Sequence, residues 1–302
     1  MKVLRRVAVS IGIVLGLIVL LAGAVQFASA RDLAHHYPIT LRPLAEPVPD
    51  SAMLARGAHL AGAIGKCAEC HGDDLGGKIM ADDPALGLLV APNITSGRGG
   101  VTADFAMADW DLVIRHGVRP TDSTTLILMP SEDYAPMTDG DLAALVTYLR
   151  QIPPVDRVMP PHSELRMVGR GLLVAGKLPI LSAEKVDHAT LPAPVQPGAT
   201  AEYGAYLANL GGCTGCHGPQ LSGGPIPGMP PETPPAANIT PTGIGQFSEA
   251  DFFRALREGV RPDGTKISDV MPIRFTRQMT DDETLALYRY LRTVPPRPFG
   301  GR

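Results

Sequence analysis

The distribution of apolar and charged residues divides the chain into a hydrophobic start and a mixed remainder. Lys2, Arg5 and Arg6 precede an uncharged apolar run over residues 7–25. A helix of this length spans about 28 Å, close to the hydrocarbon thickness of a bilayer. A positive flank before such a run directs the chain that follows out of the cytoplasm. The pattern therefore predicts a hydrophobic helix within residues 1–30 and an exported remainder.

Two interpretations of this segment remain open. Ala28, Ser29 and Ala30 match the small-residue pattern of a signal-peptidase site, and cleavage near Ala30 would release a soluble periplasmic protein. The apolar run is longer than the usual signal-peptide core of about 7–15 residues, which favours a retained transmembrane anchor over residues 7–25. Both interpretations place the rest of the chain on the periplasmic side of a bacterial inner membrane. Residues 31–50, with four prolines, are expected to form an extended tether.

The remainder has the spacing of short helices. Leu142, Leu145, Val146 and Leu149 recur at helical intervals after the cap residue Thr138. Similar patterns predict helices over residues 108–116 and 249–258, each followed by a glycine. The chain also contains 30 prolines and 33 glycines, so we expect short helices joined by loops and little regular sheet.

The same pattern occurs twice in the same order. The paired stretches are residues 57–60 and 204–207, 93–95 and 238–240, 117–120 and 259–262, 129–130 and 271–272, and 148–150 and 290–292. Such an ordered repeat indicates a duplicated domain. It predicts a mainly α fold with one domain over residues 51–152, a linker over 153–198 and a second domain over 199–302.

Each domain contains one Cys-X-X-Cys-His motif. Two thiols on one helical turn can bond to the two vinyl groups of a haem, and the adjacent histidine can ligate its iron. Zinc would require further ligands close in space, and a redox dithiol would sit in a strand–helix unit, which the pattern does not show. The sequence therefore predicts two haems c, held by Cys67, Cys70 and His71 and by Cys213, Cys216 and His217.

The sixth iron ligands are predicted to be Met129 and Met271. Both precede a proline and occupy the same place in the repeat, before the last helix of the domain. Met137 and Met279 also repeat, but they lie at the start of that helix, where a core position is expected. Histidine and methionine together favour ferrous iron and a raised potential, which suits an electron carrier.

Two further repeated pairs are candidates for contacts with the haem. Asn93 and Asn238 begin Asn-Ile-Thr segments, and a loop that hydrogen-bonds near the haem edge is one interpretation of them. A glycosylation sequon is the other. Arg119 and Arg261 lie in Gly-Val-Arg-Pro turns and could pair with a haem propionate or remain surface arginines.

Composition narrows the function. All 4 cysteines belong to the haem motifs, so none is left for a disulfide or a catalytic thiol, and we expect no catalytic residue. The formal charge of −3 gives no indication of a nucleic-acid partner. The partners we expect are redox proteins and, through the hydrophobic helix, the membrane.

These motifs, with the stretch over residues 255–264 and the closing Tyr-Leu-Arg, resemble the cytochrome c subunits of membrane-bound alcohol and gluconate dehydrogenases. The resemblance covers residues 51–302. It implies two domains of the mono-haem cytochrome c fold, with His71 and His217 opposite Met129 and Met271. It also implies electron transfer from a periplasmic dehydrogenase towards quinone or a terminal oxidase.

Subunits of that family typically carry three haem motifs, whereas this chain has two. A subunit of a dehydrogenase complex and a separate carrier that serves a respiratory complex therefore both stay open. The alternative to a carrier is a haem enzyme, a two-haem peroxidase or a small-molecule oxidase, with one open iron site. A methionine at the same place in both domains favours the carrier.

Overall fold

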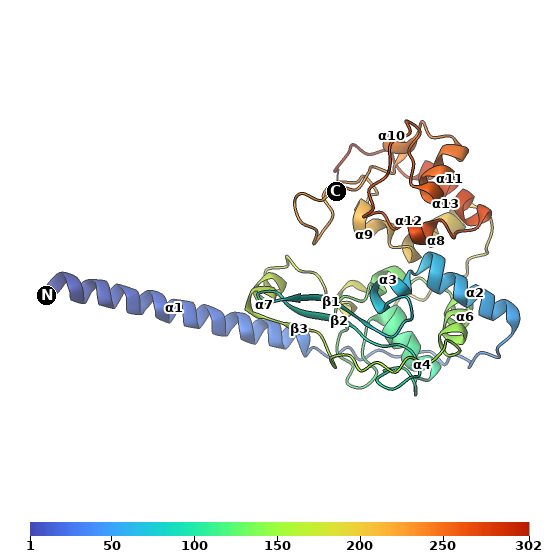
Figure 1. Ribbon diagram of the computed structural model, residues 1–302. Coiled ribbons are helices and arrows are strands. Elements are labelled where there is room, and N and C mark those ends of the chain that lie inside the picture. Colours follow the sequence, from blue (N-terminus) through green and yellow to red (C-terminus); the bar gives the residue numbers. More distant parts are fainter. Residues whose placement is uncertain (302) are drawn as a thin grey trace.

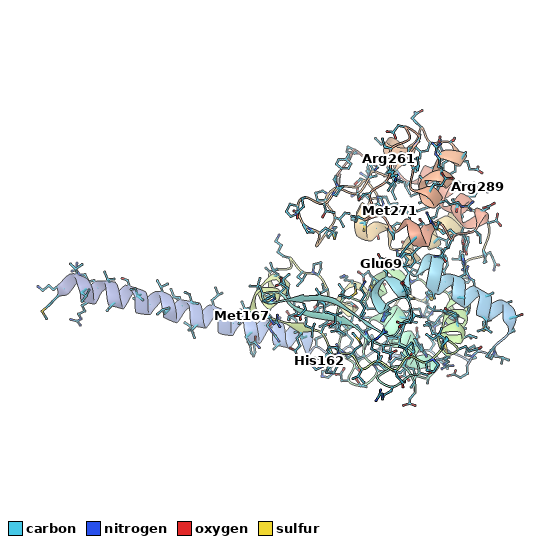
Figure 2. The ribbon with its side chains drawn as sticks, in the orientation of Figure 1. Glu69, His162, Met167, Arg261, Met271 and Arg289 are labelled. Atoms are coloured by element: carbon cyan, nitrogen blue, oxygen red, sulfur yellow. The ribbon has the colours of Figure 1, made fainter. Side chains whose placement is uncertain are left out.

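The computed structural model describes residues 1–301 of the chain. A long helix, α1 (Lys2–Leu33), leads into two largely helical domains that pack against each other (Figure 1). Side chains over most of α1 are exposed and point away from the rest of the protein (Figure 2). The prediction of a mainly α fold with two repeated domains after a hydrophobic helix is confirmed.

The first domain forms around the first cysteine motif. Its elements in chain order are α2 (Ser51–His59), the π-helical turn η1 (Leu60–Ile64), α3 (Cys67–His71), β1 (Lys78–Asp83), β2 (Gly87–Ala91), α4 (Met107–Asp111), the π-helical turn η2 (Leu112–His116), α5 (Ser131–Tyr134) and α6 (Asp139–Leu149). The linker adds β3 (Glu164–Leu165), α7 (Met167–Val174) and a 3-10 turn, η3 (Ala183–Lys185). The helix expected over residues 108–116 is thus α4 continued by η2.

The second domain repeats the helices of the first. Its elements are α8 (Ala201–Leu210), α9 (Cys213–His217), α10 (Pro241–Ile244), α11 (Glu249–Glu258), α12 (Ile273–Thr276) and α13 (Asp281–Thr293). In this order α8, α9, α12 and α13 correspond to α2, α3, α5 and α6. The helix expected over residues 249–258 is confirmed as α11.

Side-chain caps explain where the last helix of each domain begins. The hydroxyl of Thr138 accepts a hydrogen bond from the backbone N–H of Asp141, and Thr280 does the same for Glu283, both at 3.2 Å. Each bond satisfies one of the backbone N–H groups that a helix leaves unpaired in its first turn. Glu283 also accepts from the N–H of Thr280 at 3.0 Å, which completes a capping box.

The first and last helices of each domain cross at a glycine. A Cβ atom at Gly57 of α2 would lie 2.0 Å from the carbonyl oxygen of Ala144 in α6. A Cβ atom at Gly204 of α8 would lie 2.0 Å from the carbonyl oxygen of Ala286 in α13. Only glycine permits backbones to approach this closely. The repeated Gly-Ala pair therefore sets the distance between the two helices in both domains.

The first domain also carries a small sheet that the sequence did not lead us to expect. β1 and β2 form an antiparallel hairpin in which Lys78 faces Ala91 and Asp83 faces Gly87. β3, from the linker, pairs antiparallel with the start of β2. The linker is thereby fastened to the first domain through backbone hydrogen bonds.

The tether, residues 31–50, packs against the first domain. The guanidinium of Arg42 forms an ion pair with Asp139 at 2.5 Å, and Arg150 forms one with Glu46 at 2.7 Å. The segment after α1 therefore runs along the surface of the first domain and fixes where α1 leaves it.

The two domains meet through a set of polar side chains, which we call the interdomain cluster: Arg56, His59, Asp141, Tyr203, Tyr206 and Glu283. His59 of the first domain contacts Glu283 of the second, with 2.6 Å between Nε2 and Oε2. In the reverse sense, the hydroxyl of Tyr206 donates to Asp141 at 2.7 Å. Because Tyr206 is the repeat counterpart of His59 and Glu283 that of Asp141, the interface is approximately two-fold symmetric.

Arg56 lies at the centre of this cluster. Its guanidinium forms ion pairs with Asp141 of its own domain at 2.8 Å and with Glu283 of the second domain at 3.2 Å. It also donates to the hydroxyl of Tyr203, its own repeat counterpart, at 3.0 Å. Burial opposes ionisation of Glu283, but hydrogen bonds and the charges of His59 and Arg56 outweigh it and lower its pKa to about 2.

Candidate haem-binding sites

The cysteine motifs form the single-turn helices α3 and α9. Lys66 and its counterpart Gly212 precede them in the left-handed backbone conformation, with φ of 52° and 62°. This bend turns the chain from the preceding helix into the motif. On one helical turn the two cysteines, three residues apart, face the same side, and the histidine follows directly. The geometry suits attachment of one haem to each motif.

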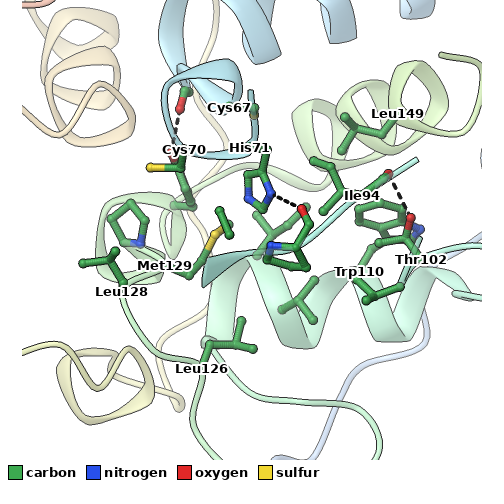
Figure 3. A pocket seen from close by; sticks show the side chains of 18 of the residues that line it. Cys67, Cys70, His71, Ile94, Thr102, Trp110, Leu126, Leu128, Met129 and Leu149 are labelled. Carbon is green, nitrogen blue, oxygen red and sulfur yellow. Dashed lines mark hydrogen bonds between the residues drawn. The ribbon is translucent and has the colours of Figure 1, made fainter. Parts of the chain in front are cut away.

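A backbone carbonyl orients the imidazole of each motif. Nδ1 of His71 lies 2.8 Å from the oxygen of Pro92, and Nδ1 of His217 lies 2.7 Å from that of Ala237 (Figure 3 shows the first). Because a carbonyl oxygen can only accept, Nδ1 carries the proton. Burial lowers the pKa of both imidazoles, which favours the neutral form. Nε2 is then left with a lone pair for a metal, the usual arrangement of a ligating histidine.

The first domain encloses a cavity of about 520 Å³ beside α3. Cys67, Cys70, His71 and Met129 all line it, with His71 on α3 and Met129 in the loop before α5 (Figure 3). Its other walls are mostly apolar and include Ile64, Ile94, Trp110, Leu145 and Leu149. The volume and the apolar lining are those of a cofactor pocket.

An unpartnered polar atom supports the fit of a haem to this cavity. Nε1 of Trp110 is buried and has no hydrogen-bond partner within the described chain, although Trp110 lines the cavity. A buried N–H group is stabilised only when an acceptor reaches it, and a carboxylate of the cofactor is such an acceptor. The sequence analysis did not find this residue. Its counterpart in the second domain, Phe252, offers no donor.

Three methionines line the cavity, and their positions differ. Met137 is buried in the hydrophobic core, as its counterpart Met279 is. Met80 lies on the hairpin strand β1. Met129 lies in the loop before α5, where its carbonyl accepts a hydrogen bond from Ser182 of the linker at 2.5 Å. The linker thus holds the loop that carries Met129.

The two asparagines hydrogen-bond to backbone carbonyls. The side-chain amide of Asn93 is fully buried and donates to the carbonyl of Val155 at 2.7 Å, and that of Asn238 donates to Arg297 at 2.7 Å. Each asparagine therefore holds the loop segment that follows the last helix of its domain. Pro92 and Ala237, the residues before the asparagines, supply the carbonyls that orient His71 and His217. The repeated Asn-Ile-Thr segment accordingly fixes the histidine acceptor.

The two arginines keep their predicted position in a turn. Arg119 lines the cavity, and its Nη1 donates to the carbonyl of Thr125 at 2.7 Å. Arg261 makes the matching bond to Lys266 at 2.6 Å. Each turn thus holds its arginine by one edge of the guanidinium.

Comparison with known proteins assigns the chain to a family. Residues 52–149 match the family of cytochrome c oxidase, cbb3-type, subunit III, and residues 201–295 match the cytochrome c family. A dihaem cytochrome c-type protein of Cereibacter sphaeroides is 30% identical over 258 residues, which are 76% of this chain and 82% of that protein. The chain belongs to the dihaem c-type cytochromes. It binds two haems c, and it is an electron-transfer protein.

The cytochrome is also related to dehydrogenase subunits, as the motifs indicated. The cytochrome c subunit of a quinone alcohol dehydrogenase of Gluconacetobacter polyoxogenes is 28% identical over 83% of this chain and 58% of its own length. The cytochrome c subunit of gluconate 2-dehydrogenase of Pantoea cypripedii is 27% identical over 85% of this chain and 63% of its own length. The cytochrome thus spans about three fifths of these subunits.

The two cysteine motifs of the cytochrome lie side by side across the domain interface. Leu210 and Gly212 of the second domain line the cavity of the first, and Gly212 directly precedes Cys213. The ammonium group of Lys66, next to Cys67, donates to the carbonyl of Gly211. The interdomain contacts therefore bring the thioether ends of the two haem sites together.

Proposed function

We propose that this cytochrome carries electrons on the periplasmic side of the inner membrane, between a dehydrogenase or respiratory complex and an acceptor such as a terminal oxidase. The observation that carries the proposal is the cavity of the first domain, which His71 and Met129 both line. His71 and Met129 would ligate the iron of one haem, and His217 and Met271 would ligate that of the other.

The role of the protein follows from this assignment. The haem supplies the one-electron chemistry once it is bound. Pro92 and Ala237 hold the two imidazoles in the tautomer that binds iron, and Ser182 holds the Met129 loop. The apolar walls exclude water, and histidine with methionine favours the ferrous state. The contact between Lys66 and Gly211 keeps the two sites at a constant separation.

The methionine assignment is tested in the ferric spectrum of the holoprotein. We expect Met129→Ala to remove about half of the long-wavelength methionine–iron charge-transfer band and to lower one of the two midpoint potentials. Met80→Leu changes another methionine of the same cavity and should leave the band intact. Met271→Ala should remove the other half.

Two results would contradict the assignment. A full band in Met129→Ala would show that another group ligates the first iron. A high-spin ferric haem in the unaltered protein would reveal an open iron site and favour the haem enzyme over the carrier.

We also infer that α1 is retained as a membrane anchor. The helix runs unbroken through Ala28 and Ala30 to Leu33, and Ser29 between the two alanines is fully buried. The hydroxyl of Ser29 accepts a hydrogen bond from Arg170 of α7 at 2.9 Å. A packed helical segment is a poor peptidase substrate, which favours the anchor over cleavage near Ala30. The intact mass of the protein from membranes tests this inference.

A further inference from the structure

Helix α7 occupies a distinctive place beside the anchor. It lies against the last turns of α1, at the end of the globular part from which α1 leaves (Figure 1). Met167, at the start of α7, is found at the same end (Figure 2). Arg170 links the two helices through Ser29. The position of α7 along α1 is therefore known from a direct contact.

That position coincides with the level of a bilayer surface. The uncharged stretch of α1 starts after Arg6 and continues to Ala30, with Arg31 as the next charge. A hydrocarbon core of about 30 Å takes up about 20 helical residues. The outer surface of the bilayer therefore lies close to residues 25–30, which is the height at which Ser29 touches α7.

The outer face of α7 is apolar. Met167, Val168 and Val174 are 48%, 51% and 41% exposed. Exposed apolar side chains gathered on one short helix mark a surface that another apolar phase covers. Residues 166–177 also carry three basic residues, Arg166, Arg170 and Lys177, and no acidic one. Apolar side chains with flanking cations are the composition of a segment that lies in the interface of an anionic bilayer.

The rest of the domain holds α7 in this orientation. Leu165 of β3 is buried on the sheet, and a Cβ atom at Gly169 would lie 2.1 Å from the carbonyl of Leu86 at the hairpin tip. Arg166 reaches back to the hairpin, where it donates to the carbonyl of Asp83 at 2.6 Å and lies 3.7 Å from Asp82. The hairpin and α1 thus cover two sides of α7 and leave the face with Met167 and Val168 outward.

We propose that α7 is a second membrane contact, which rests its apolar face in the outer leaflet and directs Lys177 to anionic lipid headgroups. The proposal rests on the inferred retention of α1. It makes the first domain a body seated on the bilayer at two points. The hairpin that walls the haem cavity then lies just above the lipid surface.

Photo-crosslinking of the full-length holoprotein in lipid nanodiscs tests the contact. A benzophenone amino acid at position 168 should form lipid adducts, which mass spectrometry detects. The matched control is the same amino acid in place of Val48, which is 83% exposed and lies shortly before the start of α2. Helix α2 lies at the end of the domain away from α1 (Figure 1). The control should give no lipid adduct. Because both sites are exposed, neither substitution should disturb folding. An unchanged haem absorbance verifies that both variants fold.

Headgroup charge provides a second measurement. We expect the yield of lipid adduct at position 168 to fall at least about fivefold when phosphatidylcholine replaces phosphatidylglycerol. Each cation near an anionic membrane surface strengthens binding by about fivefold. The variant Lys177→Glu should lower the adduct in phosphatidylglycerol nanodiscs in the same direction.

The outcomes separate this proposal from the anchor on which it rests. A protein of full mass that inserts into the nanodisc but forms no lipid adduct at position 168 would overturn the α7 contact and leave the anchor standing. A mature chain that lacks α1 would overturn the anchor. If position 168 instead crosslinks to a protein in native membranes, a protein partner and not lipid covers the outer face of α7. That result would also overturn the proposal.

Discussion

The imidazole of each haem-motif histidine is oriented by a backbone carbonyl, which belongs to the residue before a repeated asparagine. Pro92 and Ala237 supply the carbonyls, and Asn93 and Asn238 tie those loops to the chain beyond the last helix of each domain. The asparagine side chains also accept from the threonine two residues on, at 2.9 Å from its N–H in both domains. A fully bonded buried amide of this kind stabilises one loop geometry.

The asparagine has a measurable effect on stability. We expect Asn93→Ala to lower the free energy of unfolding by about 2–3 kcal/mol, because several hydrogen bonds are lost, among them those that the amide donates to the carbonyls of Val155 and Arg157. Asn209→Ala, at an exposed position of α8, should change it little. Chemical denaturation followed at the haem absorbance compares the two. Equal stabilities for both variants would contradict the stabilising role of Asn93.

At the scale of elements, each domain is built around the crossing of its first and last helices. The caps at Thr138 and Thr280 start the last helix, and Gly57 and Gly204 allow the first helix to approach it. The cap residue and the glycine occur in both halves of the sequence because both domains contain the same helix crossing. The β1–β2 hairpin belongs to the first domain and is not part of the repeat. The second domain has a proline-containing loop at the corresponding place.

The crossing predicts an asymmetry between two glycines of the first domain. Gly57→Ala should destabilise the protein by about 1–3 kcal/mol, since its methyl group would meet the carbonyl of Ala144 and the helices would have to separate. A Cβ atom at Gly140 in α6 meets no atom within 4 Å, so Gly140→Ala should be neutral or slightly stabilising. Thermal unfolding of both variants measures the difference, and a harmless Gly57→Ala would refute the close crossing.

At the scale of the whole molecule, the interdomain cluster joins the two haem domains. The pKa of Glu283 is about 2 in the folded protein, below the ordinary value of 4.5. A lowered folded pKa contributes stability above the unfolded pKa, and this contribution is lost as pH falls from about 4.5 towards 2. Acid should therefore loosen the domain contact in this window.

The variant Glu283→Gln isolates this effect. Glutamine can keep the capping box of α13 while it removes the charge that pairs with Arg56 and His59. We expect a loss of about 1.5–3 kcal/mol at neutral pH, typical of hydrogen bonds to charged groups, and a difference from the unaltered protein that shrinks below pH 4.5. Asp282→Asn on the same helical turn, which is exposed, is the control. Denaturation at several pH values measures both, and a pH-independent difference would contradict the assignment.

Sequence patterns carry much of this organisation. The hydrophobic helix, the two cysteine motifs and the helices capped at Thr138 and Thr280 could all be predicted, because each depends on residues a few positions apart. The duplication could be predicted because the same short stretches return in the same order. Methionine candidates followed from the register of the repeat. The true neighbours of Asn93 and the unpartnered N–H of Trp110 could not be predicted, because their surroundings come from distant segments.

By itself, the sequence determined which groups attach haem and where helices start, since thioether spacing and helix caps are local chemistry. Only the tertiary structure decided how the two domains face each other. It also decided that the linker forms β3 and that α7 lies at the foot of the anchor. These features depend on contacts such as Arg56 with Glu283 and Arg170 with Ser29, which join residues far apart in the chain. Such pairs have no periodic or local signature, and folding alone brings them together.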